Sequence, residues 1–126
     1  MHEYFLKDTR FKKILLGDLN VAPLENDVWS HKQLLNVVSH TPIETEILLK
    51  IIDTGAWIDV MREFVPHNEK LYSWWSYRNR NWEISNRGRR LDHFWVTKSF
   101  LNLYFVYFDK KNLYYHLKKK RSRNFF

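Results

Sequence analysis

The chain of 126 residues contains no cysteine. This excludes disulfide bonds, a catalytic thiol and cysteine-based zinc sites, and it suits a reducing compartment. No stretch is apolar for long enough to span a bilayer, and no signal peptide opens the sequence. We therefore expect a cytoplasmic protein that makes no use of a membrane.

The chain is rich in aromatic residues and in positive charge. Phe, Trp and Tyr make up 17% of the residues, and the formal net charge is +7. The length and the aromatic content suffice for one small domain with a buried core. A basic surface favours a polyanionic partner such as nucleic acid, with an anionic membrane as the alternative.

The local patterns predict an α/β domain with a mostly antiparallel sheet. The clearest helix begins at the capping box Thr41-Pro42-Ile43-Glu44 and ends with Gly55 in the C′ position. We expect its apolar face to consist of Ile47, Leu48, Ile51 and Ile52. A weaker helix is expected at 28–38, strands at 13–16, 57–61, 72–77 and 91–96, loops at 20–27 and 66–70, and a long turn at 78–90.

The last 26 residues, 101–126, differ in character from the rest. They are mostly Phe, Tyr, Lys, Asn and Leu, without helical or strand periodicity. Such a mixture results when A- and T-rich codons are read out of frame. The alternative is a genuine basic, aromatic tail that binds nucleic acid or a membrane surface. We therefore separate residues 1–100, the domain, from a divergent tail at 101–126.

The stretch ILLGDLN, from Ile14 to Asn20, changes abruptly from apolar to polar. Side chains two residues apart on a strand point to the same face, so Asp18 and Asn20 are expected to reach out together. An aspartate there can accept a proton from water, and an asparagine can orient that water or hold a phosphate oxygen. The alternative is an ordinary Asx turn, because both residue types commonly bond their own backbone.

Two adjacent tryptophans form a second cluster, in the segment LYSWWSYR at 71–78. Neighbouring residues on a strand alternate faces, so one of Trp74 and Trp75 can pack into the core while the other stays at the surface. An exposed indole beside Arg78 would serve as a wedge or stacking platform for nucleic acid. The alternative places both rings in the core, which is the commoner role for aromatics.

The third cluster is NRGRRLDHF, at 86–94. Arg87, Arg89 and Arg90 surround Gly88, and a loop of this kind can meet a phosphate backbone. Asp92 begins a strand that reads as buried, where a carboxylate needs a partner. A histidine partner would make it an acid that orients an imidazolium, whereas a nearby arginine would make it half of a structural ion pair.

In this order and spacing, the elements GDLN-V-AP-x-E-x-DVW, WW-S-YR and N-R-G-x-R-LDH resemble the exonuclease III family of DNA-repair nucleases. That family belongs to the endonuclease/exonuclease/phosphatase superfamily, and the resemblance runs from about Ile14 to about Val96. It implies a DNase I-like, four-layered α/β sandwich, of which this chain holds part. It also implies hydrolysis of DNA phosphodiesters with Mg²⁺ or Mn²⁺, at abasic sites and at 3′ ends.

The resemblance implies a role for each matched residue. Asp18 matches the residue that activates or positions the attacking water, and Asn20 matches the carboxamide near the phosphate and metal, so both are candidate metal ligands. Asp92 matches the acid that orients the catalytic histidine. The remaining candidates contact substrate: Trp74 and Trp75 as the wall of an abasic-sugar pocket, and Arg78, Asn86 and Arg87 at the DNA backbone.

The chain also departs from the family pattern. The family's first-strand asparagine, its metal-binding glutamate and a later tyrosine have no match upstream of Ile14, and Glu3 lies in no comparable context. The closing Ser-Asp-His-x-Pro-Val segment is missing, and His116 has neither the acid before it nor the proline after it. We therefore expect residues 1–100 to be an incomplete domain, truncated at both ends, with inactive or impaired chemistry.

Two other functions stay open. The chain can be a non-catalytic fragment that holds double-stranded DNA through its basic loops and aromatic rings. Alternatively, it can be one half of a split enzyme whose N-terminal half is encoded separately. Unless such a second half exists, we expect a monomer. Metal-dependent cleavage of DNA separates a nuclease from a binding module.

Overall fold

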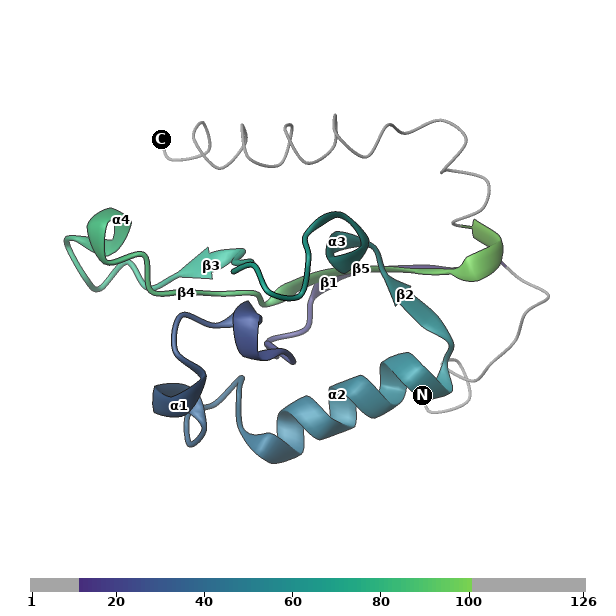
Figure 1. Cartoon of the computed structure of the whole chain (residues 1–126), viewed down its shortest axis with the longest axis horizontal. Helices are drawn as coiled ribbons and strands as arrows, with labels where there is room; N and C mark the ends of the chain where they lie inside the picture. The colour runs from purple at the N-terminus through teal and green to yellow at the C-terminus, as the bar shows by residue number, and fades with distance from the viewer. Residues whose placement is uncertain (1–11, 101–126) are drawn as a thin grey trace.

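The computed structural model describes residues 12–100, drawn in colour in Figure 1. Its main sheet has the strand order β1-β5-β2, and a smaller sheet pairs β3 with β4; every one of these pairings is antiparallel. The strands are β1 (Ile14–Asp18), β2 (Trp57–Asp59), β3 (Trp74–Trp75), β4 (Gly88–Arg89) and β5 (Asp92–Thr97). The helices are η2 (Glu25–Asp27), α1 (His31–Leu34), α2 (Pro42–Thr54), α3 (Val60–Phe64) and α4 (Trp82–Ser85). The predicted tail at 101–126, with Glu3 and His116, lies outside the described residues.

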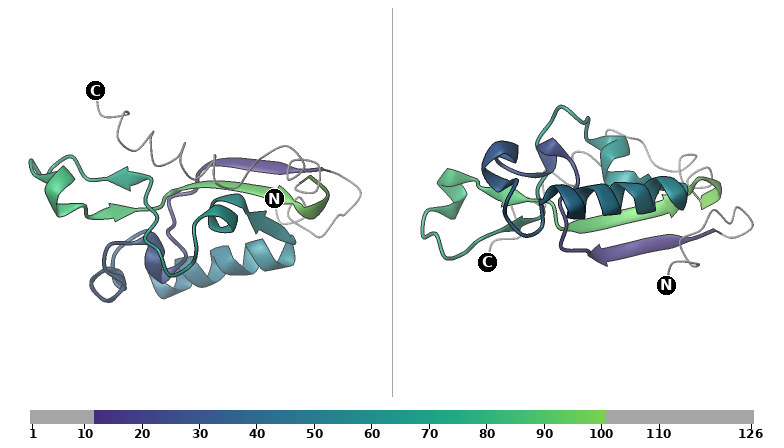
Figure 2. Two further views of the ribbon diagram at one scale, coloured as in Figure 1. Left: turned by 45° about the horizontal axis from the view of Figure 1, so that its top comes forward. Right: turned by 90° about the horizontal axis from the view of Figure 1, so that it is seen from below.

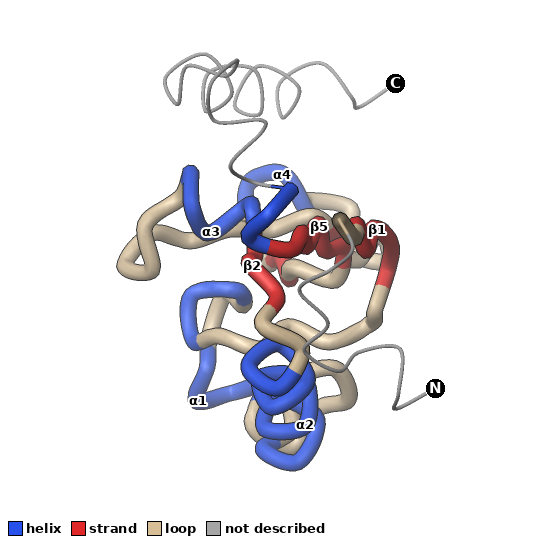
Figure 3. Tube along the Cα trace, turned by 90° about the vertical axis from the view of Figure 1, so that its right-hand side faces the viewer, coloured by secondary structure: helices blue, strands red, loops and turns tan. Residues whose placement is uncertain are grey.

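Helix α2 covers one face of the main sheet. Figure 3 shows it on one side of the strands, and the right view of Figure 2 shows it running along β5 with β1 at the margin. The core between them contains Leu48, Trp57 and Trp95, with Leu15 packed against it. Since neighbouring strand residues alternate faces, Ile14 and Leu16 point away from α2. They are 51% and 75% exposed, so the far face of β1 is apolar and open.

The start of α2 confirms the capping box. One carboxylate oxygen of Glu44 accepts the hydroxyl of Thr41 at 2.6 Å and the backbone N–H of Thr41 at 3.1 Å. The predicted apolar face is correct at Leu48 but wrong at Ile47, which is 54% exposed. Ile51 and Ile52 pack against the same core as Leu48, so the buried stripe of the helix is narrower than predicted.

The end of α2 corrects the expectation for Gly55. Gly55 has φ −80°, a right-handed value, and the following Ala56 takes the left-handed conformation with φ 50°. The helix therefore closes one residue later than predicted, with an alanine at the position that glycine usually occupies.

Ala56→Gly should therefore stabilise the domain by about 0.5–1 kcal/mol, because a Cβ is unfavourable in the left-handed region. Urea unfolding of the two proteins measures the difference. Asp53→Gly, at an exposed helical position nearby, is the matched control and should destabilise the domain slightly, because glycine has a lower helix propensity than aspartate. An Ala56→Gly protein as unstable as the control would contradict the assignment.

The other boundary predictions differ from the structure in both directions. The strand expected at 13–16 runs to Asp18, the strand expected at 91–96 is shifted by one residue to 92–97, and the helix expected at 28–38 is reduced to α1 at His31–Leu34. The strand expected at 57–61 ends at Asp59, and α3 follows directly. The strand expected at 72–77 shrinks to β3, and the turn expected at 78–90 contains α4 and β4. Tertiary contacts set these limits: the ring of Tyr72 packs over Gly88, where a Cβ would lie 2.5 Å from the ring, so the β3–β4 pairing depends on that glycine.

A buried network of charges joins η2 to α3, to the end of β2 and to the connection between β4 and β5. Both oxygens of the fully buried Asp27 are paired, one with Arg62 at 2.5 Å and one with Arg90 at 2.8 Å. Arg90 reaches Asp59 at 2.7 Å as well. Burial alone would lower the pKa of Arg90, but attraction to Asp27 and Asp59 outweighs burial and raises it. No local sequence pattern predicts this network.

Candidate active site

Asp18 and Asp92 face each other across the β1–β5 pair. They are cross-strand partners in the antiparallel register, so their side chains project from the same face of the sheet. Both residues are exposed. Asp92 was expected to be buried, but burial begins one residue later, at His93. The structure thus brings together two carboxylates that lie 74 positions apart in the sequence.

Asp92 does not form the ion pair that was its structural alternative. Within residues 12–100, Arg90 pairs with Asp27 and Asp59 instead. No imidazole hydrogen-bonds to Asp92 in the same part of the chain. Its backbone N–H is held by the hydroxyl of Ser73 at 3.0 Å, which fixes the residue while leaving its carboxylate at the surface.

Asn20 lies just beyond the end of β1. Its φ of 55° is left-handed, and its backbone N–H donates to Oδ1 of Asp18 at 2.8 Å. The Asx turn considered from the sequence is therefore present, and the strand does not continue to Asn20. The turn fixes the Asp18 carboxylate and sets Asn20 beside it, so local structure and a chemical role are compatible here.

The two tryptophans alternate as the strand period predicts. Trp75 is 8% exposed and Trp74 is 38% exposed. The buried indole donates from Nε1 to Oδ1 of Asn86 at 2.9 Å. Asn86, expected at the DNA backbone, thus uses its amide oxygen to hold Trp75 in place.

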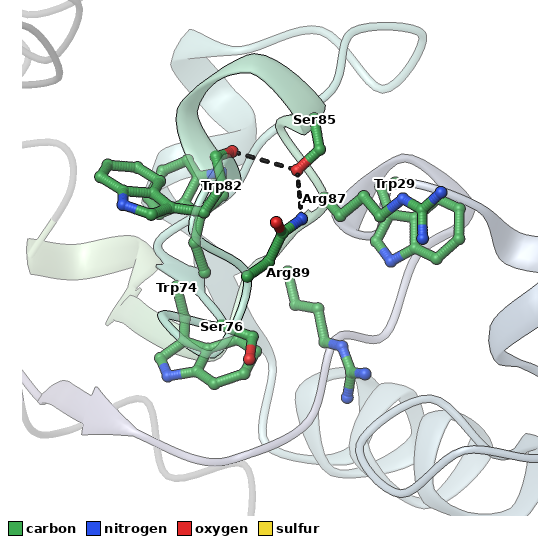
Figure 4. Close-up of a pocket in the computed structure, with 9 residues that line it drawn as sticks. Trp29, Trp74, Ser76, Trp82, Ser85, Arg87 and Arg89 are labelled. Atoms are coloured by element: carbon green, nitrogen blue, oxygen red, sulfur yellow. Dashed lines mark hydrogen bonds between the residues drawn. The ribbon is translucent and has the colours of Figure 1, made fainter.

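A pocket of about 220 Å³ lies beside Trp74 (Figure 4). Arg89 lies over the Trp74 ring at 5.7 Å, and Arg87 lies over the Trp29 ring at 4.6 Å, each measured from the guanidinium carbon to the ring centre. No acidic residue is among the lining residues, which are Trp29, Trp74, Trp75, Ser76, Asn79, Trp82, Ser85, Arg87 and Arg89. The pocket is therefore aromatic and cationic, and it suits a ligand that combines an apolar ring with negative charge.

Several predicted residues lie apart from this pocket. Asp18, Asn20, Asp92 and Arg78 do not line it. The two parts are joined by Ser73, which precedes Trp74 and whose hydroxyl accepts the backbone N–H groups of Leu91 and Asp92, both at 3.0 Å. Of the residues that sequence reasoning did not select, Trp29 stands in the DVW element, while Ser73 and Trp82 carried no recognisable signal.

The donor atoms at the carboxylate pair suit a hard divalent cation. Carboxylate and amide oxygens are the ligands that Mg²⁺ prefers, usually one or two carboxylates completed by water and substrate phosphate. Within residues 12–100, no group of three or more His, Asp or Glu side chains gathers as a metal site. Asp18 and Asn20 can thus supply part of a coordination shell.

The endonuclease/exonuclease/phosphatase family model matches residues 4–110, most of the chain. The chain belongs to that family, in its exonuclease III group. An exodeoxyribonuclease of Bacillus subtilis (strain 168) is 37% identical over 92 residues, which are 73% of this chain and 36% of the relative. The DNA repair nuclease APEX1 of Danio rerio is 34% identical over 94 residues, 75% of this chain and 30% of the relative.

Solved structures agree with this exonuclease III assignment. An AP endonuclease from Archaeoglobus fulgidus superposes with a TM-score of 0.69 and 33% identity, over 76% of this chain and 37% of that one. A 3′ phosphatase from Neisseria, bound to a product DNA hairpin, superposes with a TM-score of 0.64 and 27% identity, over 72% of this chain and 35% of that one. The predicted DNase I-like α/β fold is therefore confirmed.

This member of the exonuclease III group spans about a third of the length of the curated relatives it matches. The activity and substrates of these relatives belong to proteins about three times as long as the matched part. Among the helices of residues 12–100, none combines the length and the apolar character needed to cross a bilayer.

Proposed function

We propose that this chain carries part of a DNA phosphodiester hydrolase of the exodeoxyribonuclease III type, acting on abasic sites and 3′ ends of double-stranded DNA. The observation that carries the proposal is the cross-strand pairing of Asp18 with Asp92 on one exposed face. The names of the relatives, an exodeoxyribonuclease and AP endonucleases, support it.

Asp18 is the group that takes the proton from the attacking water. The water oxygen forms a bond to phosphorus, the bond from phosphorus to the ester oxygen breaks, and the leaving oxygen takes a proton from the surrounding water. The amide of Asn20 donates to a nonbridging phosphate oxygen, where negative charge grows. The carboxylate of Asp92 holds an imidazolium beside the same phosphate, supplied from outside residues 12–100.

Mg²⁺ or Mn²⁺ at Asp18 and Asn20 would stabilise the charge on the phosphate. The ligands provided by residues 12–100 fall short of a group of three, so we propose a low rate for the chain by itself. Positioned catalytic groups act as a unit, and a site that lacks some of them loses orders of magnitude in rate.

The tryptophan–arginine pocket supplies substrate contacts in this proposal. Trp74 offers an exposed ring for the sugar that lacks a base, and Trp75 backs it from the core. Arg78 and Arg87 are exposed and face the phosphate backbone, so their contribution should weaken as salt rises.

The open face of β1 favours the split-enzyme alternative, in which a second polypeptide completes the active site. Ile14 and Leu16 stand on the same face as Asp18, and both are exposed. A second polypeptide that covers this face would bury apolar surface and reach the carboxylate pair together. The N-terminal half of the same fold, encoded separately, is the partner we propose; without it the chain is a DNA-binding fragment.

Cleavage of a duplex with one abasic site, in Mg²⁺, tests the function. We expect the purified chain to cut at least about a hundredfold more slowly than the Bacillus subtilis exodeoxyribonuclease, and addition of the unmatched portion of that enzyme to raise the rate. Equal rates for the chain and the relative would contradict the impairment. If the chain binds DNA in a salt-sensitive way but cuts it neither alone nor with the added portion, it is a binding module and not part of a nuclease.

A further inference from the structure

The segment that carries Asn20 is held from both sides by backbone hydrogen bonds. The N–H of Leu19 donates to the carbonyl of Leu91 at 2.9 Å, next to Asp92. The N–H of Ala22 donates to the carbonyl of Ser39 at 2.8 Å. The carbonyl groups of Val21 and Ala22 follow Asn20 directly in the same segment.

Each of these two carbonyl groups lies against a buried imidazole. Nε2 of His93 is 2.7 Å from the oxygen of Val21, and Nδ1 of His40 is 2.6 Å from the oxygen of Ala22. Both histidines are 1% exposed. Because a carbonyl oxygen only accepts hydrogen bonds, both ring nitrogens must carry a proton and donate it.

The surroundings of the second nitrogen of each ring indicate whether that nitrogen carries a proton. Nε2 of His40 is 2.7 Å from Nδ1 of His31, so one of these two nitrogens must be unprotonated. Nδ1 of His93 is buried and has no hydrogen-bond partner within residues 12–100. A proton there would be a buried donor without an acceptor, which is unfavourable. The neutral form of His93, protonated at Nε2, is therefore the one that fits.

We propose that His93 and His40 are positioning residues, which fix the left-handed Asn20 beside Asp18 by holding the next two carbonyl groups. The inference rests on the proposed role of Asn20 in the reaction. Neither histidine touches the reacting atoms, so each acts through the backbone of residues 20–22. Since the fit requires neutral His93, acidification loosens the segment.

The surrounding charges support this direction. Burial lowers the pKa of His93, and the guanidinium of Arg90 lowers it further, while the hydrogen bond to the Val21 carbonyl and the charges of Asp59 and Asp27 act in the opposite sense without reversing the shift. Burial likewise lowers the pKa of His40, and it outweighs the hydrogen bond to the Ala22 carbonyl, which raises the pKa; His31 and Arg89 add to the lowering and Asp27 opposes it. The folded protein thus prefers both rings neutral, and this stabilisation is complete above the ordinary value of 6.5 and fades as the pH falls below it.

The test uses backbone resonances of the ¹⁵N-labelled full chain. His93→Leu and His40→Leu remove the donors, whereas His93→Gln and His40→Asn keep an N–H near the original nitrogen and do not titrate. We expect the leucine variants to shift the Asn20 amide resonance and to speed exchange of the Ala22 amide roughly tenfold. Amides within α2 should keep their protection, and the amide variants should restore the wild-type pattern.

The pH dependence gives a second readout. As the pH falls well below the ordinary histidine value of 6.5, the Asn20 resonance should move in the wild type and stay fixed in the His93→Gln/His40→Asn double variant. If the leucine variants do not fold, this comparison alone decides. If the protein is folded and the Asn20 resonance changes neither with pH nor with substitution of His93 and His40, the proposal is overturned. No DNA cleavage enters this test, so its failure is distinguishable from failure of the nuclease function.

Discussion

Asp27→Asn should destabilise the domain by about 3–5 kcal/mol, the range for breaking a buried ion pair from one side. Asp27 is fully buried and neutralises two guanidinium groups that are themselves buried, those of Arg62 and Arg90. An asparagine has nearly the same shape but no charge, so Arg62 would lose the carboxylate that it pairs with, and Arg90 would keep only Asp59. A loss of this size approaches the whole stability of a small domain.

Urea unfolding followed by circular dichroism measures this loss of unfolding free energy. If the Asp27→Asn protein is already unfolded at 25 °C without urea, that result also agrees with the expected loss. Asp53→Asn is the matched control, because Asp53 is exposed on α2 and should tolerate the change within about 0.5 kcal/mol. Similar stability of the two variants would show that the network does not hold the domain together.

Asp18→Asn should lower the rate of abasic-site cleavage by about 10²–10⁴-fold, the usual contribution of a positioned general base. An amide cannot accept the proton from water. It can still accept the backbone N–H of Asn20 through its carbonyl oxygen, which preserves the turn. The variant should therefore bind DNA and unfold like the wild type, so that the loss lies in the chemical step.

The rate is measured with the complementing portion of the Bacillus subtilis enzyme present, where activity is expected to be highest. Asp53→Asn again serves as the control and should cleave at the wild-type rate. If Asp18→Asn also cleaves at that rate, the carboxylate pair is not the site of the reaction. Loss of folding in the variant would instead assign Asp18 a structural role.

The sequence by itself determined the features that depend on neighbours in the chain. The capping box of α2 involves residues three apart, and the Asx turn at Asp18 and Asn20 involves residues two apart. The alternation of Trp74 and Trp75 follows from the strand period. The motifs also indicated the family, because their order and spacing are properties of the chain.

Only the tertiary structure decided which distant groups meet. Strand register sets Asp18 opposite Asp92, and a shift of one residue would send every side chain of the strand to the other face. Packing assigned Arg90 to Asp27 and Asp59, which left Asp92 free of that arginine at the surface. The contacts of His93 and His40 with the carbonyl groups beside Asn20 span 72 and 18 positions. No local pattern encodes such contacts, because they arise when burial brings separate segments together and each buried polar group must find a partner.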